Sequence, residues 1–210
     1  MRVTKFTHSC IRVDGPGVLV VDPGVFSDPG ALTGADAVLI THEHPDHLDP
    51  DRLAEAHRAN PSLVVHAHPQ VLPRLAALGD AVTAVEPGQA FTAAGLDVTA
   101  YGGQHAVIHP DIPLVANLAF LISDSTMSVY HPGDSFEVPD VSVDVLFAPI
   151  SAPWLKISES IDFVRAVKPG RVFALHDGFT TEAGARLVDT HLTNLSGSGY
   201  RRLAPGTGID

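Results

Sequence analysis

The sequence predicts an α+β fold in which two β-sheets pack together and helices cover their outer faces. Short apolar runs, each ending at a turn marked by proline, glycine or polar residues, dominate the first half of the chain. Two of them, residues 17–21 and 35–41, are almost wholly apolar, which indicates strands covered on both faces. Segments with a helical pattern lie between and after the strands. A sandwich of two sheets with outer helices satisfies this arrangement.

The expected elements follow one another along the whole chain. Strands are expected at residues 2–6, 10–13, 17–21, 35–41, 63–67, 81–85, 90–92, 96–101, 117–123, 126–130, 143–148, 171–175 and 200–203. Helices are expected at residues 50–59, 69–78, 157–168 and 181–193. Asp49 is the expected N-cap of the first helix, Gly79 closes the second, and Ser158 is the candidate N-cap of the third. No linker, repeat or low-complexity segment interrupts the pattern, so we expect one domain over residues 1–210.

The composition limits the partners that this chain can have. Its formal net charge is −11 and no Lys/Arg cluster offsets this, which argues against nucleic acid. The single cysteine, Cys10, cannot form an internal disulfide, and we find no signal peptide and no membrane-spanning run. We therefore expect a cytoplasmic protein with a small-molecule substrate and no membrane partner. An anionic substrate is compatible with this, because bound metal ions would reverse the local field. The sequence is also compatible with a homo-oligomer.

The segment THEHPDH, directly after the expected buried strand 35–41, carries the main chemical signal. It places His42, His44, Asp46 and His47 within six residues. In extended backbone His42 and His44 point to the same side and can share one ion. The turn at Pro45 then presents the other two to a second ion. Imidazole and carboxylate ligands suit zinc, and also Mn²⁺, Fe²⁺ or Ni²⁺. The alternative, a solvated loop that is rich in histidine, does not account for this order beyond an apolar strand.

Three further candidate ligands stand after other expected strands. His105 follows the strand at 96–101, Asp134 follows the strand at 126–130, and His176 ends the strand at 171–175. Loops at the carboxyl ends of strands gather side chains into one site, so we expect all three near the motif.

These motifs resemble the metallo-β-lactamase fold superfamily over nearly the whole chain. The resemblance lies in His-x-His-x-Asp-His after a buried strand, a distant His, a Gly-Asp pair and a late His. It implies an αββα sandwich. The opening THSC, the DPG turn at residues 22–24 and the segment YHPGD are most similar to small bacterial proteins like ascorbate-6-phosphate lactonase. Thr7 stands where that subgroup has glycine.

The resemblance also implies how the ligands divide between two divalent ions. One ion would be bound by His42, His44 and His105. The other would be bound by Asp46, His47 and His176, with Asp134 bridging the two. Such a pair of ions lowers the pKa of water from about 15.7 to near 7, and Asp46 would be the catalytic residue that accepts its proton.

The function expected from these residues is that of a metal-dependent hydrolase acting on a small ester-like substrate, a lactone or a phosphorylated sugar lactone. The alternative enzyme is a phosphodiesterase or RNA-processing nuclease, although the acidic chain lacks the basic surface which that activity uses. A non-catalytic metal-binding module is the alternative from another class. That reading predicts a missing ligand, and none is missing.

Three more residues are weaker candidates. His8 in THSC is a candidate substrate contact, and a hydrogen-bonded strand histidine is the equal alternative. His109, four residues after His105, could line the substrate pocket. Asp22 could order the loops beside the ions without binding one, or it could simply form the turn before Pro23.

Overall fold

The computed structural model describes residues 1–210 and contains two seven-stranded sheets. In the first sheet the strand order is β14-β1-β2-β3-β4-β5-β6. Its strands are β1 (Arg2–Lys5), β2 (Ile11–Asp14), β3 (Val18–Val21), β4 (Ala37–Ile40), β5 (Val64–Ala67), β6 (Val82–Ala84) and β14 (Thr207–Ile209). In the second sheet the order is β13-β12-β11-β10-β9-β8-β7. Its strands are β7 (Ala90–Ala93), β8 (Leu96–Gly102), β9 (Leu118–Ser123), β10 (Ser128–His131), β11 (Val145–Pro149), β12 (Arg171–Leu175) and β13 (Gly199–Arg201).

Both sheets are mixed, and each has an antiparallel part and a parallel part. Strands β14, β1, β2 and β3 pair antiparallel, whereas β3, β4, β5 and β6 pair parallel. The second sheet repeats this plan, with β7 to β10 antiparallel and β10 to β13 parallel. Strand β4 is buried along its whole length, as its continuous apolar sequence predicts.

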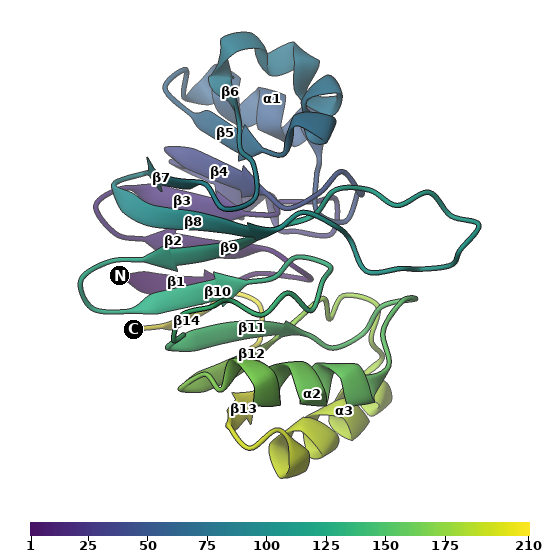
Figure 1. Ribbon diagram of the computed structural model, residues 1–210. Coiled ribbons are helices and arrows are strands. Elements are labelled where there is room, and N and C mark those ends of the chain that lie inside the picture. Colours follow the sequence, from purple (N-terminus) through teal and green to yellow (C-terminus); the bar gives the residue numbers. More distant parts are fainter.

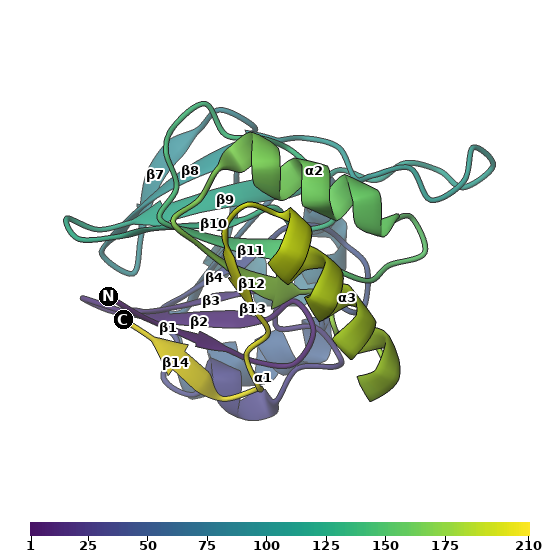
Figure 2. The same ribbon diagram turned by 90° about the horizontal axis from the view of Figure 1, so that it is seen from below.

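Three apolar clusters hold four layers together. The largest lies between the sheets and joins residues of both, such as Leu19 and Leu39 with Phe120 and Phe147. A second cluster packs the outer face of the first sheet against helix α1 (Pro50–Ala59) and the 3₁₀ segment η2 (Pro69–Ala81). The third packs the second sheet against α2 (Ile157–Val167) and α3 (Glu182–Leu195). Helix α1 therefore lies at the opposite end of the molecule from α2 and α3 (Figures 1 and 2). The predicted α+β sandwich is confirmed.

Three local predictions need correction. Residues 69–81 form 3₁₀ turns rather than an α-helix, because Pro73 lies inside the segment and Gly79 has a non-helical backbone. The N-cap of α2 is Lys156 rather than Ser158, and Glu159 accepts a hydrogen bond from the Lys156 backbone N–H at 2.7 Å. Strand β14 was not predicted, because its three residues include a glycine and form a strand only by pairing with β1.

The termini lie side by side, at the edge where β14 pairs with β1 (Figures 1 and 2). The loop between β8 and β9 extends away from the rest of the molecule in both views. A short 3₁₀ turn, η1 (Pro29–Leu32), precedes β4. None of the helices combines the length and apolar character that a membrane span requires.

Candidate metal centre

Residues 41–49 connect β4 to α1 and carry the histidine-rich motif. The loop is tight, since the Leu48 N–H donates to the His44 carbonyl at 2.9 Å. Gly24, in the turn after β3, packs directly on this loop: a Cβ atom there would lie 2.1 Å from the carbonyl oxygen of Asp46. Only glycine fits at that position, which explains the DPG turn. The end of β3 thus shapes the motif that follows β4.

The first ligand group consists of His42, His44, His105 and Asp134, and one ligand atom of each lies within 4.8 Å of the others. Nε2 of His42 is 3.0 Å from Nδ1 of His44. Nε2 of His105 is 3.3 Å from Oδ2 of Asp134. The two motif histidines follow β4 of the first sheet, while His105 and Asp134 follow β8 and β10 of the second. Both sheets are therefore needed to build this group.

The second ligand group consists of Asp46, His47 and His176, and His8 lies within the same 4.8 Å. Nε2 of His176 is 3.3 Å from Oδ2 of Asp46, and Nε2 of His47 is 3.7 Å from the same oxygen. His176 directly follows β12 of the second sheet, so this group also draws on both sheets.

Asp134 lies between the two groups and contacts both. Its Oδ1 atom is 3.1 Å from Nε2 of His47, and its Oδ2 atom is 3.2 Å from Nε2 of His176. The same Oδ2 atom is 3.3 Å from Nε2 of His105 in the first group. All seven ligands expected from the sequence thus meet in one place, and Asp134 has the position expected of a bridge.

The distances and the donor types fit divalent metal ions. In a tetrahedral zinc site, bonds of 2.0–2.1 Å place neighbouring ligand atoms about 3.3 Å apart. The separations above fall around that value. Three buried atoms at the centre, His105 Nε2, His176 Nε2 and Asp134 Oδ1, have no hydrogen-bond partner. Buried polar atoms are normally satisfied, so three of them at one point indicate a ligand that accepts their lone pairs.

The charges in the centre are strongly coupled. Burial and the neighbouring His47 hold the pKa of His42 well below its usual value, so its ring is neutral and able to bind a metal. Burial opposes a charge on Asp134, but His47 and His176 outweigh it and keep the pKa of that carboxyl well below the usual range. Burial likewise opposes a charge on His47, yet Asp134 and Asp22 raise its pKa well above the usual value. In both cases a positive charge beside the carboxylates is favoured, which is what bound cations supply.

Backbone strain is concentrated at this centre. Five non-glycine residues have a positive φ angle, and three of them belong to the site: His8 at 65°, Asp22 at 49° and His176 at 57°. Such conformations are unfavourable for residues with a Cβ atom and persist where the surrounding structure fixes them.

Asp22 orients His47 through Nδ1, the ring nitrogen that points away from the centre. Its Oδ2 atom accepts hydrogen bonds from Nδ1 of His47 at 2.7 Å and from Oγ1 of Thr41 at 2.7 Å, and its Oδ1 atom accepts the Thr41 N–H at 2.8 Å. Because Nδ1 of His47 donates to Asp22, its Nε2 atom faces the centre, where the deprotonated nitrogen would bind an ion. The side chain of Asp22 is fully buried. The structure thus places Asp22 where it orders the motif loop without reaching an ion.

Two other ligand rings are fixed by backbone carbonyls. Nδ1 of His176 donates to the Ser151 carbonyl at 2.6 Å. Nδ1 of His105 donates to the carbonyl of Ala106 at 2.5 Å. Both rings therefore turn their Nε2 atoms toward Asp134, the orientation that metal binding requires.

The family described as Beta-lactamase superfamily domain matches residues 2–176. The chain belongs to the metallo-β-lactamase superfamily. It is 41% identical over 207 residues to Protein Rv0786c of Mycobacterium tuberculosis, which covers 97% of this chain and 96% of that protein. It is 26% identical over 196 residues to a UPF0173 metal-dependent hydrolase of Archaeoglobus fulgidus, covering 84% of this chain and 83% of that protein. The fold is similar to that of Igni18, a metallo hydrolase of Ignicoccus hospitalis (TM-score 0.77, 20% identity, 99% and 97% covered). At the level of the superfamily and of a metal-dependent hydrolase, the resemblance seen in the sequence is confirmed.

Trp154 contacts this metallo-β-lactamase centre but was not among the site residues expected from the sequence. Its Nε1–H donates to Oδ2 of Asp134 at 3.0 Å, and its ring lies 6.0 Å from that of His105 and 6.4 Å from that of His176. The one available signal was its place in the loop after β11, since other ligands also follow strands. A single tryptophan next to a proline in the sequence does not predict a hydrogen bond to a metal ligand.

The remaining histidines take varied places. His109 is 61% exposed on the loop between β8 and β9, with Asp111 at 3.6 Å, so the structure does not bring it into the centre. His131 ends β10, and its buried Nε2 donates to the Ser9 carbonyl at 2.8 Å. His66 is buried in β5, and its ring lies 4.8 Å from that of Phe91.

Aromatic side chains form one rim of the centre. Phe26 and Phe179 meet edge to face with ring centroids 5.2 Å apart, and they are 45% and 53% exposed. The Phe179 ring also lies 5.7 Å from that of His176. An exposed apolar surface therefore lies beside the second ligand group.

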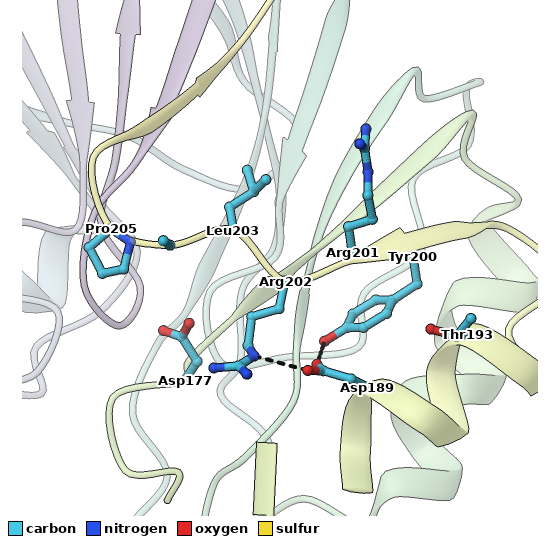
Figure 3. A pocket seen from close by; sticks show the side chains of 9 residues that line it. Asp177, Asp189, Thr193, Tyr200, Arg201, Arg202, Leu203 and Pro205 are labelled. Atoms are coloured by element: carbon cyan, nitrogen blue, oxygen red, sulfur yellow. Dashed lines mark hydrogen bonds and ion pairs between the residues drawn. The ribbon is translucent and has the colours of Figure 1, made fainter. Parts of the chain in front are cut away.

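A separate cavity of about 520 Å³ lies beside α3 and the C-terminal segment (Figure 3). Inside it, Asp189 accepts hydrogen bonds from Oη of Tyr200 at 2.7 Å and from Nε of Arg202 at 3.0 Å. Arg202 also pairs with Glu182 at 3.2 Å. These polar groups satisfy one another, so the cavity presents no free ligand set like that of the metal centre. Asp177, which follows His176, forms part of its wall.

Proposed function

We propose that this metal-dependent hydrolase binds two divalent ions, Zn²⁺ above all, and cleaves a small ester-like substrate such as a lactone. The observation that carries the proposal is the division of the ligands into two groups that share Asp134. A site for a single ion would leave three ligands without a role. Mn²⁺, Fe²⁺ and Ni²⁺ accept the same nitrogen and oxygen donors.

Bound ions would polarise the substrate carbonyl and lower the pKa of water. The chain's own part is to accept the proton that this water loses, and Asp46 is suited to that task. Its side chain is 17% exposed, whereas Asp134 is 4% exposed and the rings of His47 and His176 are 0–2% exposed. Asp46 is therefore the ligand of the second group that faces the opening of the site.

A nucleophilic side chain is not supported. Cys10 is fully buried, and burial raises the pKa of its thiol to about 12. Asp22, His47 and Ser9 lie in the order of a nucleophilic triad, but Oγ of Ser9 is 3.4 Å from Nε2 of His47 and has no exposed surface. A substrate cannot reach either residue, so water is the attacking group.

The aromatic rim favours substrates with an apolar part, and it supports a lactone or another small ester. A phosphorylated sugar lactone is the other form of this proposal, in which the ions themselves would attract the phosphate. Phosphodiester cleavage is the second candidate activity, because paired ions also serve that reaction. The net charge of −11 speaks against a nucleic acid substrate. A cytoplasmic location remains a prediction from the sequence.

The test is a substrate panel assayed with protein loaded with Zn²⁺ or Mn²⁺. It holds alkyl lactones, phosphorylated sugar lactones, thioesters and a chromogenic phosphodiester, each assayed also with Asp46→Asn. We expect lactone hydrolysis that chelation abolishes and that Asp46→Asn strongly reduces. Faster turnover of the phosphodiester than of any lactone would favour the second activity. A loaded protein that hydrolyses nothing would support a non-catalytic module.

A further inference from the structure

His8 is fully buried beside the second ligand group, and both of its ring nitrogens are occupied. The backbone N–H of Gly178 donates to Nδ1 at 3.1 Å, so this nitrogen carries a lone pair and no proton. In a neutral imidazole the proton is then on Nε2, which lies 2.9 Å from Oδ2 of Asp46. The ring therefore donates to Asp46 and retains no lone pair for a metal ion.

The backbone of His8 holds a second ligand. Its carbonyl oxygen accepts the N–H of His176 at 3.2 Å, so one residue contacts Asp46 through its ring and His176 through its backbone. Gly178 makes this arrangement possible, because a Cβ there would lie 2.9 Å from Nδ1 of His8. His8 and His176 both have positive φ angles, which shows that the local structure imposes this geometry.

A buried ion pair fixes this backbone in turn. The side chain of Lys5 is 1% exposed, and its Nζ donates to the carbonyl of His8 at 2.7 Å and to Oδ1 of Asp177 at 3.2 Å. Nζ also donates to the carbonyl of Phe6. A buried charge persists only where partners compensate it. Here the partners are the segments 6–8 and 176–178, which Lys5 joins.

We propose that His8 is a positioning residue for the second ion: it aligns Asp46 and His176 as ligands but binds neither the metal nor the substrate. This inference rests on the proposed two-ion function. It replaces the role of substrate contact, because a ring without exposed surface cannot touch a substrate. His8 gives the carboxylate of Asp46 a hydrogen-bond partner outside the three ligands of the second group. Groups that orient a metal ligand in this way typically change metal affinity by about 10–100-fold when they are removed.

Two substitutions separate the contacts of His8. In His8→Gln the side-chain amide extends as far as Nε2 and can still donate to Asp46. In His8→Asn the amide extends only as far as Nδ1, so it can contact Gly178 but not Asp46. Asparagine also tolerates a positive φ angle better than most residues, so this variant should fold. His191→Asn, on helix α3, is the matched control.

The measurement is Zn²⁺ binding by titration with a chromogenic chelator, with Co²⁺ absorption as a second readout of ligand geometry. We expect two ions per chain for the parent, His191→Asn and His8→Gln. For His8→Asn we expect the second ion to bind about 10–100-fold more weakly. Two equally tight ions in His8→Asn would overturn the proposal. Equal loss in both His8 variants, with an altered Co²⁺ spectrum, would make His8 a ligand and would also overturn it.

The parent protein gives a test that does not depend on how a variant folds. Long-range ¹H–¹⁵N spectra of the imidazole rings should show a proton on Nε2 of His8 both before and after Zn²⁺ is added. A proton on Nδ1 in the loaded protein would contradict the positioning role. A parent that binds one ion would overturn the two-ion proposal and this inference together. A parent with two ions and no hydrolase activity would overturn the proposed function alone.

Discussion

The two ligand groups differ in how firmly the protein holds them. In the second group each ligand has a partner outside the centre: Asp46 has His8, His47 has Asp22 and His176 has the Ser151 carbonyl. In the first group His105 and His42 have such partners, the Ala106 carbonyl and Oγ1 of Thr41. His44 is half-exposed, and its one side-chain hydrogen bond is to the ligand His42.

Because each of its ligands has such a partner, the second group is the pre-organised half of the centre. It also contains the carboxylate of Asp46, whereas the first group has only imidazoles apart from the shared Asp134. Charge and fixed geometry both favour cation binding. We therefore expect the second group to bind its ion more tightly. Substitution of Asp134, which contacts both groups, should have the largest effect, and substitutions of residues around the two groups should have smaller effects.

Asp134→Ala should have the largest effect, since it removes the carboxylate that faces ligand nitrogens of both groups. We expect the loss of hydrolysis to exceed the roughly 10–100-fold that is typical of outer partners of a metal site. The measurement is kcat/KM on the best lactone at saturating Zn²⁺. A loss below tenfold would mean that Asp134 does not connect the two groups.

Lys5→Met should destabilise the fold, because it leaves Asp177 without its buried cation and removes the hydrogen bonds that Lys5 donates to the carbonyls of Phe6 and His8. Breaking a buried pair on one side reduces the free energy of unfolding by about 3–5 kcal/mol. Urea unfolding of the metal-free protein measures this, with the exposed Lys156→Met as the control. A change of less than about 1 kcal/mol would show that the second group does not depend on this ion pair.

Asp22→Asn should weaken the second ion alone. The amide presents a weaker acceptor to Nδ1 of His47, and such changes typically reduce metal affinity by about 10–100-fold. Zn²⁺ titration should show one tight site and one weakened site. If both sites weakened equally, the two groups would not be independently supported.

Trp154→Phe should have a small effect, because it removes one hydrogen bond to Oδ2 of Asp134 and keeps most of the aromatic surface. We expect a loss of about 1 kcal/mol in transition-state stabilisation, roughly fivefold in kcat/KM. Steady-state kinetics measures this, and unchanged kinetics would show that Asp134 is held without Trp154.

The rate at which a thiol reagent labels Cys10 should report on the stability of the segment that carries His8. This measurement changes neither ligand group. Burial raises the pKa of its thiol to about 12, so the thiol stays protonated in the folded state at pH 8. The raised pKa stabilises the fold below the unfolded value of about 8.5, and this contribution is lost as the pH rises toward 12. A thiol reagent should label the native protein slowly and Lys5→Met faster. Rapid labelling of the parent at pH 8 would contradict the buried placement.

The ligands themselves could be predicted from the sequence, because each follows an apolar strand. The motif from His42 to His47 is contiguous and follows a buried strand, so its position was evident from the sequence. His105, Asp134 and His176 could be found because loops after neighbouring strands converge. The fold class and most strands followed from apolar runs in the same way.

The supporting contacts could not be predicted, because they join residues that lie far apart in the chain. His8 meets Gly178 across 170 positions, and Lys5 meets Asp177 across 172. Each contact depends on how the two sheets pack and on which ring nitrogen carries a proton. Likewise, β14 exists only through its pairing with β1, and the 3₁₀ form of residues 69–81 depends on the kink at Gly79.

The central claim is that two groups, joined by Asp134, each bind one ion. The most direct test is the metal content of the parent, His105→Ala and His176→Ala by inductively coupled plasma mass spectrometry after equilibration with limiting free Zn²⁺. We predict close to two ions per chain in the parent and close to one in each variant. One ion in the parent, or the loss of all metal in both variants, would contradict two separate groups and indicate a single site.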